Sequence, residues 1–131
     1  MTTKSLQFLL DENMSQVVAA QVHRHRLAIR IESVHTWQGG AFEGRQDKAL
    51  LLAAHVEGLT LVTYDQKTIP DLLIELYAEG EHHAGIIFVD DATIPSADFG
   101  MLTRALIFFW EQFHALDWQD RVHFLNKPPR A

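Results

Sequence analysis

The sequence contains no cysteine among its 131 residues. This absence excludes a disulfide-bonded scaffold, a metal site with Cys ligands and a thiol nucleophile. Long apolar runs are also missing, because the longest, Ala105 to Trp110, is far shorter than the ~20 residues that a transmembrane helix needs. The first seven residues lack the apolar segment of a signal peptide. We therefore expect a soluble, cytoplasmic protein that has no membrane partner.

Positive charge is scarce as well. Lys and Arg total 11 against 17 Asp and Glu, which gives a net charge of −6 with neutral His. A chain of this charge does not hold nucleic acid through bulk attraction, so any such contact requires a local basic patch. The sequence has only 7 Gly and 4 Pro, and no repeat or low-complexity linker divides it. The pattern predicts one globular domain over residues 1–131.

Short apolar runs that stop at polar residues predict β-strands, and apolar residues at helical spacing between these runs predict helices. Ser15 is expected to cap the first helix, and Gly58 to end the second. Strands that alternate with helices of ~10–20 residues favour an α/β protein, a three-layer α/β/α fold with a central, mostly parallel sheet. The predicted strands are residues 6–10, 28–35, 59–63, 85–89 and 121–125, and the longest helix is expected at about 96–116.

Acidic residues follow three of the predicted strands. Asp11 and Glu12 follow the first strand, Asp65 the third and Asp90 the fourth. The carboxyl ends of parallel strands meet at one edge, where ligands bind. Asp47, at the start of the second helix, faces this edge if its helix runs antiparallel to the strands. Each acid alone is more typical of a turn or a helix cap. Together they favour a shared site.

Clustered carboxylates repel each other unless they share protons or bind a cation. Mg²⁺ and Mn²⁺ are the natural partners, because both prefer oxygen ligands. A site of this kind can polarise a phosphodiester and generate a hydroxide for in-line attack. The pattern of acids therefore indicates phosphodiester hydrolysis with Mg²⁺ or Mn²⁺ as the cofactor.

Three segments resemble a known family. Residues 8–15, Phe-Leu-Leu-Asp-Glu-Asn-Met-Ser, resemble the LLDEN-(L/M)-S opening of short PIN-like proteins, many of which are toxins of bacterial toxin–antitoxin pairs. Residues 46–50, Gln-Asp-Lys-Ala-Leu, are similar to the segment of that family in which an Asp opens a helix. Residues 61–65, Leu-Val-Thr-Tyr-Asp, are similar to its LVTxD strand. The resemblance implies a PIN-type fold, metal-dependent endoribonuclease activity, an RNA substrate and a small antitoxin partner. The catalytic, metal-binding acids that it implies are Asp11, Asp47 and Asp65.

Other residues have supporting roles in this hypothesis. Asn13 is the supporting polar group that the resemblance implies, and Glu12 and Asp90 are further candidates. The family pattern T-x-D-x-D-F has a second acid where this chain has Lys67. A cation at that position neutralises Asp65 or binds a phosphate, but it removes a candidate metal ligand. The predicted contacts to phosphate or RNA are Arg45, Lys48 and Lys67.

The sequence leaves two other functions open. One is a catalytically degenerate PIN-like binding module, which Lys67 favours. The other is a receiver-like phosphoacceptor domain, which also has acids after its first and third strands, but Lys127 falls in the tail instead of at the end of a strand. The basic segment 23–26 is more typical of a helix C-terminus, and Trp37 of a loop anchored on the core. The aromatic stripe of helix 96–116 predicts a core face or a homodimer face.

Overall fold

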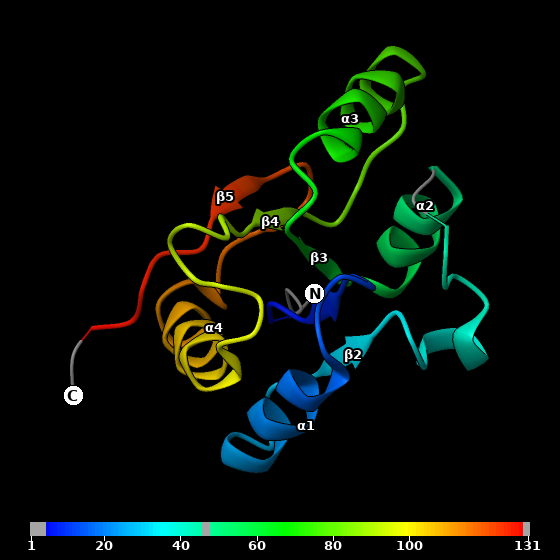
Figure 1. Ribbon diagram of the computed structural model, residues 1–131. Coiled ribbons are helices and arrows are strands. Elements are labelled where there is room, and N and C mark those ends of the chain that lie inside the picture. Colours follow the sequence, from blue (N-terminus) through cyan, green and yellow to red (C-terminus); the bar gives the residue numbers. More distant parts are fainter. Residues whose placement is uncertain (1–4, 46–47, 130–131) are drawn as a thin grey trace.

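Five short strands form one parallel sheet in the order β2-β1-β3-β4-β5 (Figure 1). The structure, a computed structural model, describes residues 5–45 and 48–129. The strands are β1 (Phe8–Leu10), β2 (Ile31–Ser33), β3 (Thr60–Thr63), β4 (Ile86–Phe88) and β5 (Val122–Phe124). The helical elements are α1 (Gln16–His25), the 3-10 turn η1 (Trp37–Gly40), α2 (Lys48–Glu57), α3 (Thr68–Ala78) and α4 (Phe99–Phe113). The predicted α/β class and parallel sheet are confirmed.

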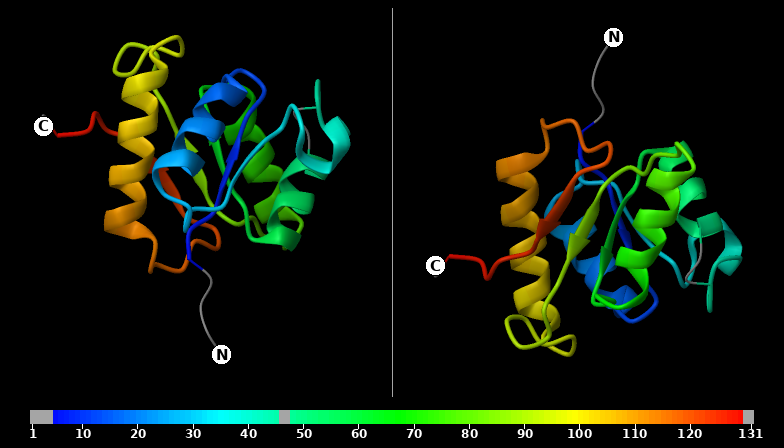
Figure 2. Two further views of the ribbon diagram at one scale, coloured as in Figure 1. Left: turned by 90° about the horizontal axis from the view of Figure 1, so that it is seen from below. Right: turned by 90° about the horizontal axis from the view of Figure 1, so that it is seen from above.

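Helices pack against both faces of the sheet. Side chains alternate along a strand, so Phe8 and Leu10 join one apolar cluster while Leu9 joins the other. The first cluster contains residues of α1 and α4, and the second contains residues of α2 and α3. We call these two sides the α1/α4 face and the α2/α3 face (Figure 2). Burial on both faces explains why the three central strands, β1, β3 and β4, are largely apolar.

The helix boundaries follow the expected capping chemistry, with one correction. The Ser15 hydroxyl accepts a hydrogen bond from the Val17 N–H at the start of α1, and Gly58 adopts a φ of 71° just after α2. The prediction that the longest helix spans about 96–116 is wrong at both ends. Asp98 caps α4 by accepting from the Met101 N–H, so the helix begins at Phe99, and it already ends at Phe113.

Within the described residues no helix has the length and apolarity that crossing a membrane would require.

The last crossover has the opposite hand to the others. From β3 to β4 and from β4 to β5 the chain moves in the same direction across the sheet. However, α3 lies on the α2/α3 face and α4 on the opposite one (Figure 1). Parallel crossovers are right-handed in about 98% of cases, so the placement of α4 is unusual. It packs α4 against α1 and leaves the β5 end of the α2/α3 face without a described helix.

Candidate functional site

The strand order creates a switch point between β1 and β3. These strands are neighbours, but the chain leaves β1 for α1 on one face and leaves β3 for α3 on the other. Connections that diverge in this way open a crevice at the carboxyl edge, which is where open α/β sheets bind ligands. Asp11 directly follows β1, and Asp65 follows β3 after one intervening residue. The topology therefore brings these two predicted site residues to the same edge.

Asp11 is held in a buried position at this edge. Asp11 is only 1% exposed to solvent. The Thr63 hydroxyl donates to Asp11 Oδ2 at 2.6 Å, and the Glu12 backbone N–H donates to Oδ1 at 2.8 Å. A buried carboxylate is costly unless it is hydrogen-bonded or paired with a cation. These donors meet part of that cost and fix the orientation of the carboxylate.

Asp65 is linked to Asp11 through the same hydroxyl. The Asp65 N–H donates to Thr63 Oγ1 at 2.9 Å, so one oxygen atom joins the backbone of Asp65 to the carboxylate of Asp11. Asp65 Oδ1 accepts from the backbone N–H groups of Lys67 and Thr68, at 3.0 and 2.8 Å. Asp65 thus caps the entry to α3 with one oxygen. No described residue hydrogen-bonds to its second carboxylate oxygen, Oδ2.

Glu12 fastens a distant loop to the edge. Its Oε2 accepts from the Gly44 N–H at 2.7 Å, and its carbonyl oxygen lies 2.9 Å from His35 Nε2. The other ring nitrogen of His35 lies 2.7 Å from Glu43 Oε2. Both partners are acceptors, so the geometry favours the imidazolium, in which both ring nitrogens donate. The hydrogen bond that the ring donates to Glu43 is the main cause that raises the pKa of His35.

The remaining predicted acids and amides are less closely engaged. Asn13 and Asp90 are exposed at the ends of β1 and β4. Asp90 Oδ1 accepts from the Ala92 N–H at 3.0 Å, which is the turn role expected for a lone acid at a strand end. Asp47 lies outside the described residues. The structure therefore places two of the three predicted catalytic acids.

The three predicted basic contacts differ in their surroundings. The Lys48 ammonium lies 3.0 and 2.8 Å from the two carboxylate oxygens of Glu79, which raises the pKa of Lys48. Its charge is thus directed at the C-terminal end of α3. The Arg45 guanidinium lies 5.5 Å from the centre of the Phe42 ring. The exposed Lys67 ammonium forms no ion pair within the described residues, and it is close in sequence to Asp65.

The sequence reasoning gave no role to Thr63 or Tyr64, although both shape the edge. Thr63 is fully buried, and its hydroxyl donates to the Asp11 carboxylate and accepts from the Asp65 backbone N–H. The Tyr64 hydroxyl donates to the carbonyl oxygen of Ile94 at 2.7 Å and fastens the loop between β4 and α4. Burial is the main cause that raises the pKa of Tyr64. The available signal was a hydroxyl side chain inside an otherwise apolar strand, directly before an acid.

Two other sequence interpretations are confirmed. Trp37 is buried, stacks on Phe42 with ring centres 5.2 Å apart, and donates from Nε1 to Glu57 Oε2 at 3.1 Å. It anchors its loop on the core instead of presenting a ring to a base. The basic residues His23, Arg24 and His25 occupy the last turn of α1, where they complement the helix dipole.

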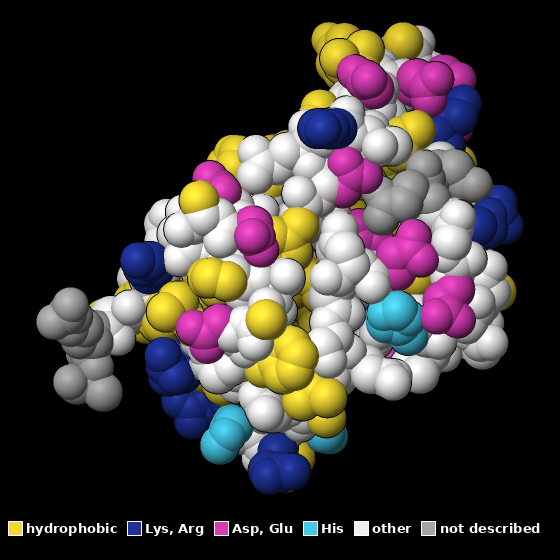
Figure 3. Space-filling model, viewed as in Figure 1, with side chains coloured by type: hydrophobic (Ala, Val, Ile, Leu, Met, Phe, Trp, Pro, Cys, Tyr) yellow, Lys and Arg dark blue, Asp and Glu magenta, His cyan; other side chains and the backbone are white. Residues whose placement is uncertain are grey.

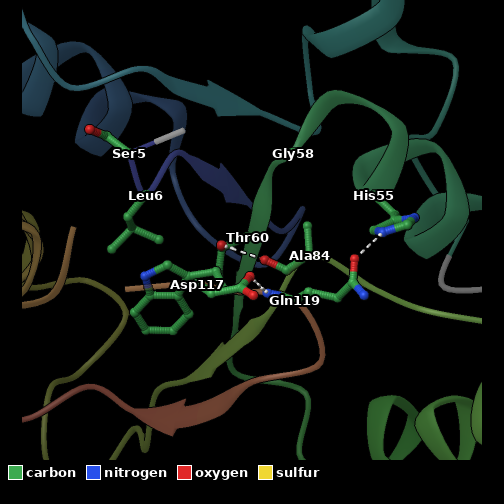
Figure 4. Close-up of a pocket in the computed structure, with 9 residues that line it drawn as sticks. Ser5, Leu6, His55, Gly58, Thr60, Ala84, Asp117 and Gln119 are labelled. Atoms are coloured by element: carbon green, nitrogen blue, oxygen red, sulfur yellow. Dashed lines mark hydrogen bonds between the residues drawn. The ribbon is translucent and has the colours of Figure 1, made fainter. Parts of the chain in front are cut away.

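A cavity of about 180 Å³ lies at the opposite, amino edge of the sheet (Figure 4). Its polar groups are paired locally: the Thr60 hydroxyl donates to the Ala84 carbonyl oxygen, and His55 Nε2 lies 3.2 Å from Gln119 Oε1. The Asp117 carboxylate accepts from the Gln119 N–H. These pairings give the cavity no convergent reactive groups, so the carboxyl edge is the better candidate site.

Across the described segments, no group of three or more His, Asp or Glu side chains is arranged to hold a metal ion. The described edge offers the two carboxylates of Asp11 and Asp65. No protein-family model matches the chain, and comparisons with curated proteins and with solved structures find no match either.

Proposed function

We propose that the protein is a metal-dependent endoribonuclease of the PIN-like type, with its active site at the carboxyl edge between β1 and β3. One observation carries the proposal: the Thr63 hydroxyl joins Asp11 and Asp65 at the switch point of the sheet. The resemblance of residues 8–15 to the PIN-like opening motif supports the same assignment. Asp47 is the third acid of the proposed site.

The chemistry of these side chains fits Mg²⁺ or Mn²⁺. Both ions prefer oxygen ligands, and Mg²⁺ is commonly held by one or two carboxylates, with waters and substrate phosphate completing its shell. Asp11 and Asp65 supply that number of carboxylates, and Asp65 Oδ2 is not used by another described residue. When bound, the cation would polarise the phosphodiester and lower the pKa of the water that it coordinates.

The protein's own groups prepare this site. The Thr63 hydroxyl and the Glu12 N–H orient the Asp11 carboxylate. The hydrogen bond from the Gly44 N–H to Glu12 holds the loop before α2 against the edge. Lys67 is the proposed phosphate contact, because its ammonium is exposed and unpaired within the described chain. Arg45 is a second candidate from the neighbouring loop. In this proposal RNA is the substrate, the protein acts in the cytoplasm, and a small antitoxin protein inhibits it.

The proposal is tested by incubating the purified protein with fluorescently labelled RNA in the presence of Mg²⁺, Mn²⁺ or a chelator. We expect cleavage that requires the metal. Asp65→Asn should lower the cleavage rate by about two orders of magnitude or more, because a charged metal ligand is lost. The asparagine oxygen still accepts from the Lys67 and Thr68 N–H groups, so α3 keeps its cap. RNA binding should be unchanged or tighter, because one repulsive charge is removed.

Asp117→Asn is the matched control, since it removes one exposed carboxylate at the opposite edge of the sheet. Its cleavage rate should equal that of the wild type. If the wild type binds RNA but never cleaves it with either metal, the protein is a degenerate PIN-like binding module and the nuclease proposal is wrong.

The strand order alone is also that of receiver-like domains. Two observations oppose that alternative. The last crossover of a regular doubly wound sheet places its helix with α3, whereas α4 lies on the other face. The Glu12 carboxylate accepts from the Gly44 N–H, so it is engaged in a loop contact instead of forming an open acidic pair with Asp11. The nuclease function is therefore preferred.

A further inference from the structure

The unusual crossover leaves part of the sheet uncovered. Because α4 lies on the α1/α4 face, the position over β4 and β5 on the α2/α3 face has no described helix (Figure 2, right). Phe124 of β5 is on this side, since its ring lies 5.5 Å from that of Phe88, a member of the α2/α3 cluster. Val122 shares this face by strand alternation. Phe124 is 55% exposed and Val122 is 45% exposed.

The backbone at this edge is open as well. Arg121 and Leu125 hydrogen-bond through their backbones to β4, so by alternation the N–H and C=O groups of Val122 and Phe124 point away from the sheet. Unpaired backbone groups at a sheet edge are a template for pairing with another chain, and the exposed apolar side chains beside them favour contact with a partner.

Helix α3 forms the other wall of a groove. A hollow of about 470 Å³ lies between α3 and β5, lined by Leu73, Leu76 and Tyr77 on one side and by Val122 on the other. Tyr77 is 87% exposed, and its neighbour Ile74 is 67% exposed. Hydrophobic side chains gather at the outer end of α3 with acidic ones beside them (Figure 3). A contiguous apolar surface of this kind marks an interaction site.

Apart from its two histidines, the charged side chains that line the groove are acidic. Its described lining includes the carboxylates of Glu81 and Asp120 but no Lys or Arg. Burial opposes ionisation of Asp120, but the hydrogen bonds that it accepts from His82 and from the His83 N–H outweigh burial and lower its pKa. Asp120 is therefore a carboxylate that is already engaged by His82, whereas the Glu81 carboxylate is exposed. Burial lowers the pKa of His83, which keeps that ring neutral at physiological pH. An occupant that carries positive charge at this end is therefore favoured.

The chain's own tail does not fill the groove. Leu125 is buried in the cluster of the α1/α4 face, and the following residues run away from α3 (Figure 1). A second copy paired through β5 would extend the sheet but would leave the space beside each α3 empty. A helix is the element that fills a space of this shape, since it would lie beside α3 over β5 as a regular crossover helix does.

We infer that the groove between α3 and β5 binds a basic amphipathic helix of a partner protein. Its apolar face packs on Tyr77, Val122 and Phe124, and a Lys or Arg side chain meets Glu81 and Asp120. The length of α3 allows an occupant of about three turns. This inference does not depend on the nuclease activity.

The probe is a fluorescent amphipathic peptide of about three turns, with Leu on one face and Lys on the other. A control peptide keeps the Leu positions and carries Glu in place of each Lys. We expect saturable binding of the Lys peptide by fluorescence anisotropy, and binding of the Glu peptide that is at least about tenfold weaker. Tyr77→Ser and Phe124→Ser should each weaken binding of the Lys peptide about tenfold. Glu81→Gln should weaken it less and reduce its dependence on salt.

Leu27→Ser and Val56→Ser are matched controls, because these residues are 77% and 82% exposed but lie outside the groove. Both variants should bind the Lys peptide like the wild type. Circular dichroism checks that every variant is folded. Equal binding of the two peptides, or equal losses in the control variants, would overturn the inference. Self-association that Phe124→Ser abolishes, together with no peptide binding, would show that a second copy is the occupant and would also overturn it.

Discussion

The Thr63 hydroxyl donates a 2.6 Å hydrogen bond to the Asp11 carboxylate, although 52 positions separate the two residues in the sequence. Both residues are buried, and each stands at the carboxyl end of one of two neighbouring strands. The same oxygen accepts from the Asp65 N–H. The relative positions of the two described acids therefore depend on one side chain that carries no charge.

Replacing Thr63 tests this dependence. Thr63→Val keeps the shape of the side chain but leaves the buried Asp11 carboxylate without one donor. We expect a loss of about 1–3 kcal/mol in the free energy of unfolding, measured by urea denaturation. Thr63→Ser retains the hydroxyl and should lose less. No loss in Thr63→Val, together with a clear loss in Thr63→Ser, would show that the methyl group matters and the hydrogen bond does not.

Much of the fold follows from sequence patterns, because β1, β3 and β4 lie in largely apolar segments that an acid follows within two residues. The face on which α4 lies does not follow, since its stripe of Leu102, Leu106 and Phe109 predicts burial but not the side of the sheet. At the site, Asp11 and Asp65 are predictable from parallel topology. The tether from Glu12 to Gly44 is not, because it joins a side chain to the backbone of a distant loop.

Metal binding should stabilise the folded protein. If Asp11 and Asp65 hold a divalent cation, Mg²⁺ or Mn²⁺ at about one hundred times its Kd adds about 2.7 kcal/mol to the free energy of unfolding by mass action. Differential scanning fluorimetry should show a higher Tm with metal than with a chelator. Asp11→Asn should abolish the increase, whereas Asp117→Asn should retain it. An unchanged Tm in the wild type would count against a metal site in the protein alone.

The His35 contact predicts a specific pH dependence. Glu43 and the Glu12 carbonyl oxygen raise the pKa of His35 above its unfolded value of about 6.5. The folded state therefore binds the proton more tightly, and the resulting stability is complete below about pH 6.5 and is lost as the pH rises through the folded pKa. The difference in Tm between wild type and His35→Gln should accordingly shrink between pH 6 and pH 9.

The pH dependence is read from the difference in Tm between wild type and His35→Gln, because His83 changes the stability of each protein with pH in the opposite sense. Burial lowers its pKa, so its contribution to stability is present above about pH 6.5 and falls as the pH drops through the folded value. The wild type and His35→Gln both contain His83, so the effect of His83 cancels when their Tm values are subtracted. A difference in Tm that grows with pH would contradict the assigned imidazolium.

Lys67 separates an active nuclease from a degenerate binding module. As a phosphate contact, its exposed ammonium contributes to RNA binding, so Lys67→Ala should raise KM with little change in kcat, and the effect should shrink as salt screens the charge. Arg24→Ala is the matched control, because this exposed residue lies in the last turn of α1, away from the carboxyl edge of the sheet, and should contribute little to RNA binding. Lys67→Asp restores the second acid of the family pattern and removes the phosphate contact. In an active wild type this change should lower kcat/KM through weaker binding. A wild type without cleavage, together with a Lys67→Asp variant that cleaves RNA with Mg²⁺ or Mn²⁺, would instead show that the lysine disables the site.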